Sequence, residues 1–180
     1  MVIIITGPTH IGKTLLAQKI LEEYKYPYLS IDHLKMGLIR SGNTTLSPCD
    51  DNLLVPYLWN IVKEIIKTAI ENNQNLVVEG CYVPFDYKNS FDEDYLKDIM
   101  FIALSMSSKY IDNNYSKIIN HESDIENRLI KEDIDINSLK IENEEFIKGF
   151  RKVNEDVVVI DENYDHVISK IIKKIGHKVK

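Results

Sequence analysis

A short glycine-containing segment near the start of the chain constrains the fold more than any other feature. Residues 7–14 read GPTHIGKT, and they lie between the apolar run Val2–Thr6 and a stretch of helical periodicity. This segment matches the pattern G-x-x-x-x-G-K-[ST] at every fixed position. A turn of this kind directs backbone N–H groups inward, and the following helix N-terminus adds partial positive charge. The segment therefore predicts a phosphate-binding loop.

Each fixed residue of this loop has a physical role. The glycines allow backbone conformations that a Cβ would hinder, Lys13 reaches the β- and γ-phosphates of a nucleotide, and the Thr14 hydroxyl is a ligand for magnesium. An ordinary strand-to-helix turn is the alternative, but it would not require Lys13 and Thr14 beside it. His10 occupies a variable position of the pattern. The predicted ATP-phosphate contacts are Gly7, Thr9, His10, Ile11, Gly12, Lys13 and Thr14.

Composition limits the class of protein. With 180 residues, of which 44% are apolar, we expect one globular domain over residues 1–180. A formal net charge of -6 argues against broad binding to nucleic acid or anionic membranes. Cys49 and Cys81 form no C-x-x-C pair, which predicts neither a zinc site nor a disulfide framework. The first apolar run is too short for a signal peptide or a membrane span, so we expect a reduced, cytoplasmic protein.

Short apolar runs alternate with segments of helical period, which predicts an α/β fold with a mainly parallel sheet. We expect strands at residues 2–6, 26–31, 76–78, 99–106 and 157–160. Helices are expected at 13–24, from 32 to about 40, through 58–69 and at 164–175, with a charged helical stretch from about 108 to 153. Residues 41–52 read as a polar loop, and Pro56 either opens the next helix or kinks its first turn.

Two acids close strands of the predicted sheet. Because parallel strands have their carboxyl ends at one edge, Asp32 and Glu79 are expected beside the phosphate loop. Asp32 is a candidate to contact the acceptor, with a helix N-cap as the alternative. Glu79 is a candidate to hold magnesium with Thr14 or to bind the acceptor, with a solvated strand end as the alternative.

The loop GPTHIGKT and the five-strand layout resemble the small P-loop kinases of the nucleoside-monophosphate-kinase-like superfamily, including shikimate kinase, chloramphenicol phosphotransferase and the zeta-toxin kinases. The resemblance implies a P-loop NTPase three-layer α/β/α sandwich with a five-stranded parallel sheet. It also implies ATP and Mg²⁺ as cofactors, an acceptor site over the second and third strands, a catalytic acid at Asp32 and a helical lid at roughly 108–140. Segments of the D-x-x-G and N-K-x-D type, which mark GTP switches, do not occur in the chain.

Positive charge for phosphoryl transfer has few candidate sources. Arg128 lies in the expected lid and is a catalytic candidate together with Lys13 and Asp32; a surface ion pair is its alternative. Lys35 and Arg40 could steady an anionic acceptor, or form a solvated helix face. The aromatic residues after Glu79 could stack on the acceptor, or fill the core. The candidate acceptor contacts are Asp32, Lys35, Arg40, Glu79 and Tyr82.

These features together predict an ATP-dependent kinase that phosphorylates a hydroxyl of a small molecule. Nucleoside monophosphate kinases grip the acceptor phosphate with an arginine just after the third strand, whereas this chain reads GCYVPFDY there. A nucleoside monophosphate kinase and a non-catalytic nucleotide-binding module are the alternatives. The expected partners are a nucleotide and a small-molecule acceptor, with no nucleic acid and no membrane. The acceptor, the preference for ATP or GTP and the oligomeric state stay open.

Overall fold

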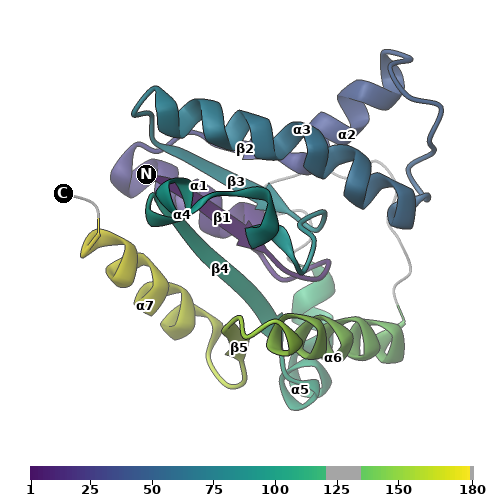
Figure 1. Ribbon diagram of the computed structural model, residues 1–180. Coiled ribbons are helices and arrows are strands. Elements are labelled where there is room, and N and C mark those ends of the chain that lie inside the picture. Colours follow the sequence, from purple (N-terminus) through teal and green to yellow (C-terminus); the bar gives the residue numbers. More distant parts are fainter. Residues whose placement is uncertain (121–134, 179–180) are drawn as a thin grey trace.

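The computed structural model describes residues 1–120 and 135–178 (Figure 1). The strands are β1 (Val2–Thr6), β2 (Tyr28–Ser30), β3 (Leu76–Gly80), β4 (Ile99–Met106) and β5 (Val157–Ile160). The α-helices are α1 (Lys13–Tyr24), α2 (Ile31–Arg40), α3 (Asp51–Glu71), α4 (Glu93–Lys97), α5 (Ser108–Asn120), α6 (Ile136–Lys152) and α7 (Tyr164–Gly176), and a short 3-10 helix, η1, spans Tyr87–Ser90.

The strands form one parallel sheet in the order β2-β3-β1-β4-β5. β1 is central, and its residue Thr6 lies beside Gly80 of β3 and Ala103 of β4. The last residue of β2, Ser30, lies beside Glu79 of β3. The carboxyl ends of the first three strands therefore meet at one edge, directly before the loop at residues 7–12.

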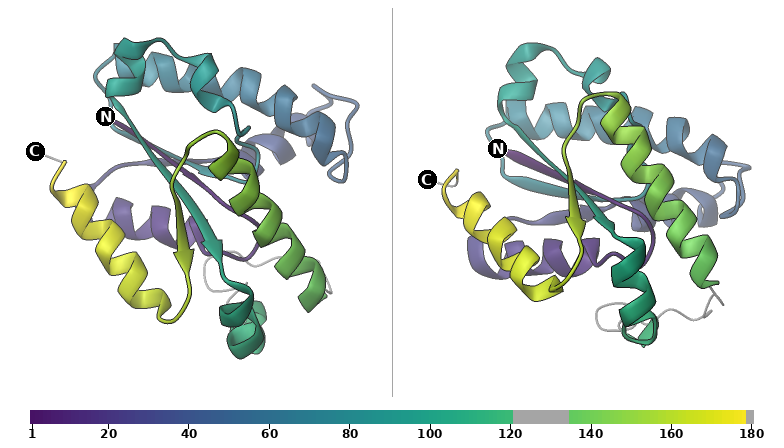
Figure 2. Two further views of the ribbon diagram at one scale, coloured as in Figure 1. Left: turned by 60° about the horizontal axis from the view of Figure 1, so that its bottom comes forward. Right: turned by 90° about the horizontal axis from the view of Figure 1, so that it is seen from below.

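β1 is buried on both faces, which explains its unbroken apolar run. Side chains alternate across a strand, so Ile3 and Ile5 pack with α1 and α7, whereas Val2 and Ile4 pack with α3. Figure 2 shows the sheet between α3 on one side and α1 and α7 on the other. The predicted α/β/α sandwich with a five-stranded parallel sheet is confirmed.

Three details differ from the sequence-based expectation. The second strand is limited to Tyr28–Ser30, shorter than the predicted 26–31. α3 begins at Asp51, within the segment expected to be a loop, so Pro56 lies inside the helix and does not open it. The segment between β3 and β4 contains the short helices η1 and α4, which sequence periodicity did not indicate because both have fewer than two turns.

A buried asparagine fastens α6 to the end of β4. Asn143 is 1% exposed, and its Oδ1 accepts hydrogen bonds from Ser105 Oγ (2.9 Å) and Met106 N (2.8 Å). Its Nδ2 donates to Leu139 O at 2.8 Å within the same helix. Both the acceptor and the donor of this side chain are thereby satisfied away from water. The position of α6 against the carboxyl edge of the sheet is therefore fixed by specific polar contacts.

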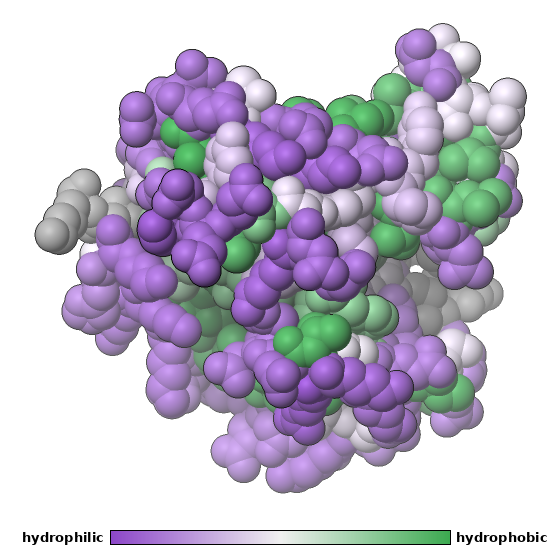
Figure 3. Space-filling model, in the orientation of Figure 1, coloured by the Kyte–Doolittle hydropathy of each residue, from purple (hydrophilic) through white to green (hydrophobic). Residues whose placement is uncertain are grey.

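The outer surface is mostly hydrophilic on the face drawn in Figure 3. Hydrophobic side chains gather there near the loop that joins α2 to α3. Leu53, in the first turn of α3, is 58% exposed. In the described part of the chain, no helix combines the length and the apolar character that crossing a membrane requires.

Asn143→Ala is expected to lower the free energy of unfolding by about 2–3 kcal/mol, because it leaves Met106 N–H buried without its acceptor. Chemical denaturation monitored by circular dichroism measures this change. Asn137→Ala is the control, since Asn137 is exposed on the same helix. Equal losses for the two variants would contradict the anchoring role of Asn143.

Candidate functional site

The loop between β1 and α1 has the backbone shape that the sequence pattern requires. Gly7 lies against the main chain of β4, where a Cβ would come within 2.6 Å of Leu104 O. Gly12 has a φ of 81°, in the left-handed region that favours glycine. As the N-cap of α1, Gly12 adds no side chain over the first free N–H groups of the helix. These amides stay open to an anionic ligand.

The first residue of α7 contacts this loop. Tyr164, the first residue of α7, donates a hydrogen bond from its hydroxyl to Gly12 O at 3.4 Å. A Cβ placed on Gly12 would come within 2.0 Å of that hydroxyl. Burial raises the pKa of Tyr164, so the phenol is neutral and acts as a donor. The shape of the phosphate loop therefore depends on a residue far away in the chain.

Lys13 lies at the centre of the candidate site. Its side chain is buried and donates from Nζ to Pro8 O at 2.8 Å, which holds the ammonium group inside the loop. Burial lowers the pKa of Lys13, but Cys81 and the carboxylates of Glu79 and Asp32 outweigh that effect and raise it above its ordinary value. The lysine is thus positively charged at neutral pH and able to attract phosphate.

The electrostatic effects of Asp32 and Glu79 on Lys13 show that the ends of β2 and β3 lie near the phosphate loop. Glu79 is 1% exposed, so the alternative of a solvated strand end does not hold. Val77 packs on the α1 side of the sheet, and the two-residue alternation puts Glu79 on that side as well. Cys81 follows it and interacts with Lys13; solvent reaches Cys81, but desolvation by the surrounding protein raises the pKa of its thiol.

Asp32 is placed differently from a helix cap. The N-cap of α2 is Ser30, and Asp32 is the second residue of the helix. Its carboxylate pairs with Lys35 Nζ at 3.2 Å and is 41% exposed. A ligand above the sheet edge can therefore reach the Asp32 carboxylate. A residue that served only as a helix cap would not need to be accessible in this way.

A polar chain continues from Asp32 away from the loop. Lys35 Nζ donates to the hydroxyl of Tyr82 at 2.6 Å, and this hydroxyl donates to Asp51 Oδ1 at 3.0 Å. Lys35 Nζ also lies 4.9 Å from the centre of the Tyr82 ring, within cation–π range. Tyr82 and Lys35 thus lie beside Asp32, and Asp51 joins them from the start of α3. Sequence reasoning missed Asp51 because it belongs to no motif and was assigned to a loop.

The oxygen groups at this edge fit a magnesium ion. Mg²⁺ is usually bound through one or two carboxylates together with substrate phosphates and water, so it needs no dedicated cage of protein ligands. Glu79 and Asp32 supply carboxylates beside the loop, and Thr14 places a hydroxyl in the first turn of α1. In residues 1–120 and 135–178, no group of three or more His, Cys, Asp or Glu forms a metal cage.

A carboxylate on α6 accepts a hydrogen bond from a backbone N–H group of the phosphate loop. The backbone N–H of Thr9 donates to Glu142 Oε1 at 3.1 Å, across 133 residues of sequence. Glu142 also helps to raise the pKa of Cys81, which shows that it lies near the ends of the strands. Its charge opposes an incoming phosphate. The sequence gave no signal for Glu142, because it is one of many acids on a charged helix.

Among the described residues, no contact joins Arg40 to this cluster. Arg40 follows Asp32 by eight residues, or about 12 Å along α2, and is exposed. Arg128 lies outside the described residues. Ile11 is buried in the core, so only its backbone faces a ligand. His10 contacts the neighbouring Thr9 hydroxyl through Nδ1 at 2.8 Å.

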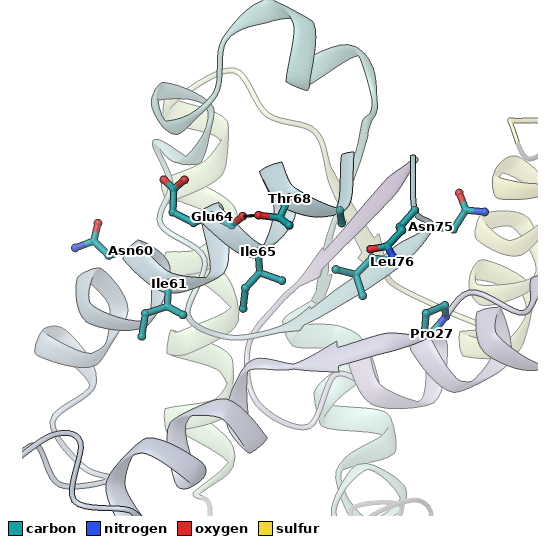
Figure 4. Close-up of a pocket in the computed structure, with 10 residues that line it drawn as sticks. Pro27, Asn60, Ile61, Glu64, Ile65, Thr68, Asn75 and Leu76 are labelled. Atoms are coloured by element: carbon teal, nitrogen blue, oxygen red, sulfur yellow. Dashed lines mark hydrogen bonds between the residues drawn. The ribbon is translucent and has the colours of Figure 1, made fainter. Parts of the chain in front are cut away.

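A separate hollow lies beside α3, at the opposite edge of the sheet (Figure 4). Ile61 and Ile65 of α3 point toward it, and Leu76, the first residue of β3, lies across from them. Because Leu76 is at the amino end of its strand, this hollow is remote from the phosphate loop. Its lining is mainly apolar and includes one ionisable residue, Glu64, which pairs with Lys67. We assign it no role in the candidate site.

Gly12→Ala is expected to weaken ATP binding at least about tenfold, because alanine disfavours a φ of 81° and its Cβ clashes with Tyr164. Calorimetric titration with ATP and magnesium measures the affinity. Gly37→Ala, in the interior of α2 with open space around it, is the control; it should leave binding unchanged and add about 0.5–1 kcal/mol of stability. Normal ATP binding by the Gly12 variant would refute this account of the loop.

Glu142→Ala is expected to tighten ATP binding about 3- to 10-fold, because the Thr9 amide is released and one negative charge leaves the site. The same titration detects it. Glu145→Ala removes an exposed acid from the same helix and should have no such effect. Weaker binding after Glu142→Ala would mean that this carboxylate supports the bound state.

Comparisons with known proteins agree with this architecture. No protein-family model matches the sequence, and no curated protein sequence matches it significantly. In structure, the chain is similar to a gluconokinase from Sinorhizobium meliloti, with a TM-score of 0.53, 14% identity, and 98% of this chain and 92% of the other covered. It is also similar to a sugar kinase from Janibacter (TM-score 0.57, 13% identity, 97% and 94% covered) and to a deoxyadenosine kinase from M. mycoides (0.54, 15%, 98% and 100%). The chain has the fold of the small P-loop kinases.

Proposed function

We propose that this protein is a kinase that transfers the γ-phosphoryl group of ATP to a hydroxyl group of a small molecule, with magnesium. The observation that carries the proposal is the convergence of Lys13, Asp32 and Glu79 at the carboxyl edge of the sheet. A phosphate-binding loop alone would suit any nucleotide-binding protein. An accessible carboxylate beside it supplies what a transfer reaction needs in addition. The kinase fold supports the same conclusion.

Binding of the nucleotide uses the loop and its lysine. The free N–H groups at the start of α1 and the Lys13 ammonium bind the β- and γ-phosphates. Lys13 then exchanges its contact with Pro8 O for phosphate oxygen. Thr14 and Glu79 would hold a magnesium ion, which would neutralise phosphate charge.

Transfer requires a base for the acceptor hydroxyl. Asp32 accepts the proton as the hydroxyl oxygen attacks the γ-phosphorus, and the bond from that phosphorus to the β–γ bridging oxygen breaks, releasing ADP. Lys35, 3.2 Å from the Asp32 carboxylate, keeps the side chain directed along this edge. Positioning and charge carry most of the catalysis, because the reaction demands little covalent chemistry from the protein.

We include in the proposal a single domain over residues 1–180 with a lid at roughly 108–140. Arg128 would then act from the lid on the transferring phosphoryl group, but it lies outside the described residues. We also propose that the protein works in the cytoplasm on small molecules and not on nucleic acid, in keeping with its net charge of -6.

Asp32→Asn is expected to lower kcat about 10²-fold or more while ATP affinity stays near normal, because the amide cannot accept the proton. Coupled detection of ADP with ATP, magnesium and a panel of hydroxyl compounds measures turnover. Asp165→Asn is a matched control, since Asp165 is also the second residue of its helix and is exposed.

Three results would count against the proposal. Full turnover by the Asp32 variant would place the base elsewhere. Tight ATP binding without acceptor-stimulated ADP release, over every class of hydroxyl compound, would instead favour a non-catalytic nucleotide-binding module. Transfer of the phosphoryl group to the phosphate of a nucleoside monophosphate would favour a nucleoside monophosphate kinase.

A further inference from the structure

Carboxylates outnumber cations around the proposed acceptor site. Asp32, Asp51 and Glu79 approach it from α2, α3 and β3. In the part of the chain that the structure describes, the cations of this cluster are Lys13, which belongs to the phosphate loop, and Lys35. Any charge selection on the acceptor therefore depends on whether Lys35 is available to it.

Lys35 is engaged by the protein itself. Its side chain is only 12% exposed, and Nζ pairs with Asp32, donates to the Tyr82 hydroxyl and lies over the Tyr82 ring. An anionic acceptor would have to compete with all three contacts. The sequence-based idea that Lys35 steadies an anionic acceptor would require this arrangement to open.

Asp51 sets the orientation of this arrangement. Tyr82 is 6% exposed, and burial together with the charges of Asp32 and Asp51 raises its pKa, so its hydroxyl keeps its proton. That proton is donated to Asp51 Oδ1, which leaves the hydroxyl oxygen to accept from Lys35 Nζ. Without the carboxylate of Asp51, Tyr82 loses the acceptor that orients it, and Lys35 is less firmly held.

We propose that Asp51 is a specificity-determining residue, which acts through Tyr82 and Lys35 to exclude acceptors that carry a phosphate or carboxylate group. This inference rests on the kinase function proposed above and names its substrate class: a hydroxyl compound without an anionic group. The exclusion has two parts. Asp51 repels an anion directly, and it keeps Lys35 paired with Asp32.

The test compares matched pairs of acceptors that differ in one anionic group. Glucitol is paired with gluconate, and each common nucleoside with its 3′-phosphate, and kcat/KM is measured from ADP formation. Wild-type protein is expected to favour the neutral member at least about tenfold. Asp51→Asn and Tyr82→Phe should each reduce that preference about tenfold, because both release Lys35.

The control is Asp94→Asn, which changes the net charge equally but removes an exposed acid from α4 at the opposite edge of the sheet. It should leave the preference unchanged. Circular dichroism and thermal melting establish that each variant is folded. Tyr82→Phe alters no charge at neutral pH, so it separates the positioning effect from simple repulsion.

Two outcomes would overturn the inference. One is a wild-type protein that uses or binds the anionic member as well as the neutral one. The other is an unchanged preference in both folded variants. If no compound stimulates ADP formation, the kinase proposal is in question, and the same pairs are titrated calorimetrically into protein saturated with a non-hydrolysable ATP analogue. Binding of the anionic members by Asp51→Asn but not by wild type then supports the role of Asp51, and no gain overturns it.

Discussion

The arrangement of the candidate site depends on the burial of β1 between β3 and β4. All five residues of this strand are buried, and both of its neighbours pair with it in parallel. The register of this pairing brings Thr6, Gly80 and Ala103 to one level, with Glu79 one residue before it and Leu104 one residue after it. The phosphate loop begins there, and Gly7 allows it to pass close to β4. The packing of the sheet thus determines where the polar groups of the site lie.

Charge is distributed unevenly over this edge. Lys13 is surrounded by acids that keep it protonated, and Glu142 takes up an N–H group of the loop. Such a site would suit the proposed ligand, which brings both negative phosphates and a divalent cation. The phosphates would satisfy the lysine and the amides, while the cation would offset the remaining carboxylates. Nucleotide and metal would therefore be expected to bind cooperatively, since each reduces the repulsion that the other meets.

Local sequence patterns revealed much of the fold. The strands and most helices follow from hydrophobic periodicity, and the phosphate loop follows from a motif with a specific backbone requirement, seen at Gly12. Strand order did not follow, because it depends on long-range packing that no local pattern encodes. The start of α3 was not foreseen: the helix begins at Asp51, so Pro56 lies inside it and does not open it.

Some residues of the candidate site could likewise be predicted from the sequence, and others could not. The electrostatic influence of Asp32 and Glu79 on Lys13 was foreseeable from the geometry of parallel strands. Asp51, Glu142 and Tyr164 were not, because each reaches the site from a helix remote in sequence and carries no spacing signal. Cys81 was considered only as a candidate for zinc or a disulfide, and its proximity to Lys13 depends on the register of β3.

The contact of Tyr164 with Gly12 has a consequence for biosynthesis. β1 and its loop leave the ribosome before any of their partners, yet the loop is braced by α7, more than 150 residues later. The β1 neighbours, β3 and β4, also emerge after it. During translation this apolar strand therefore stays unpaired until its neighbours emerge. In that state it is prone to aggregation and to binding by chaperones. The contact that braces the nucleotide loop would form only after α7 has left the ribosome.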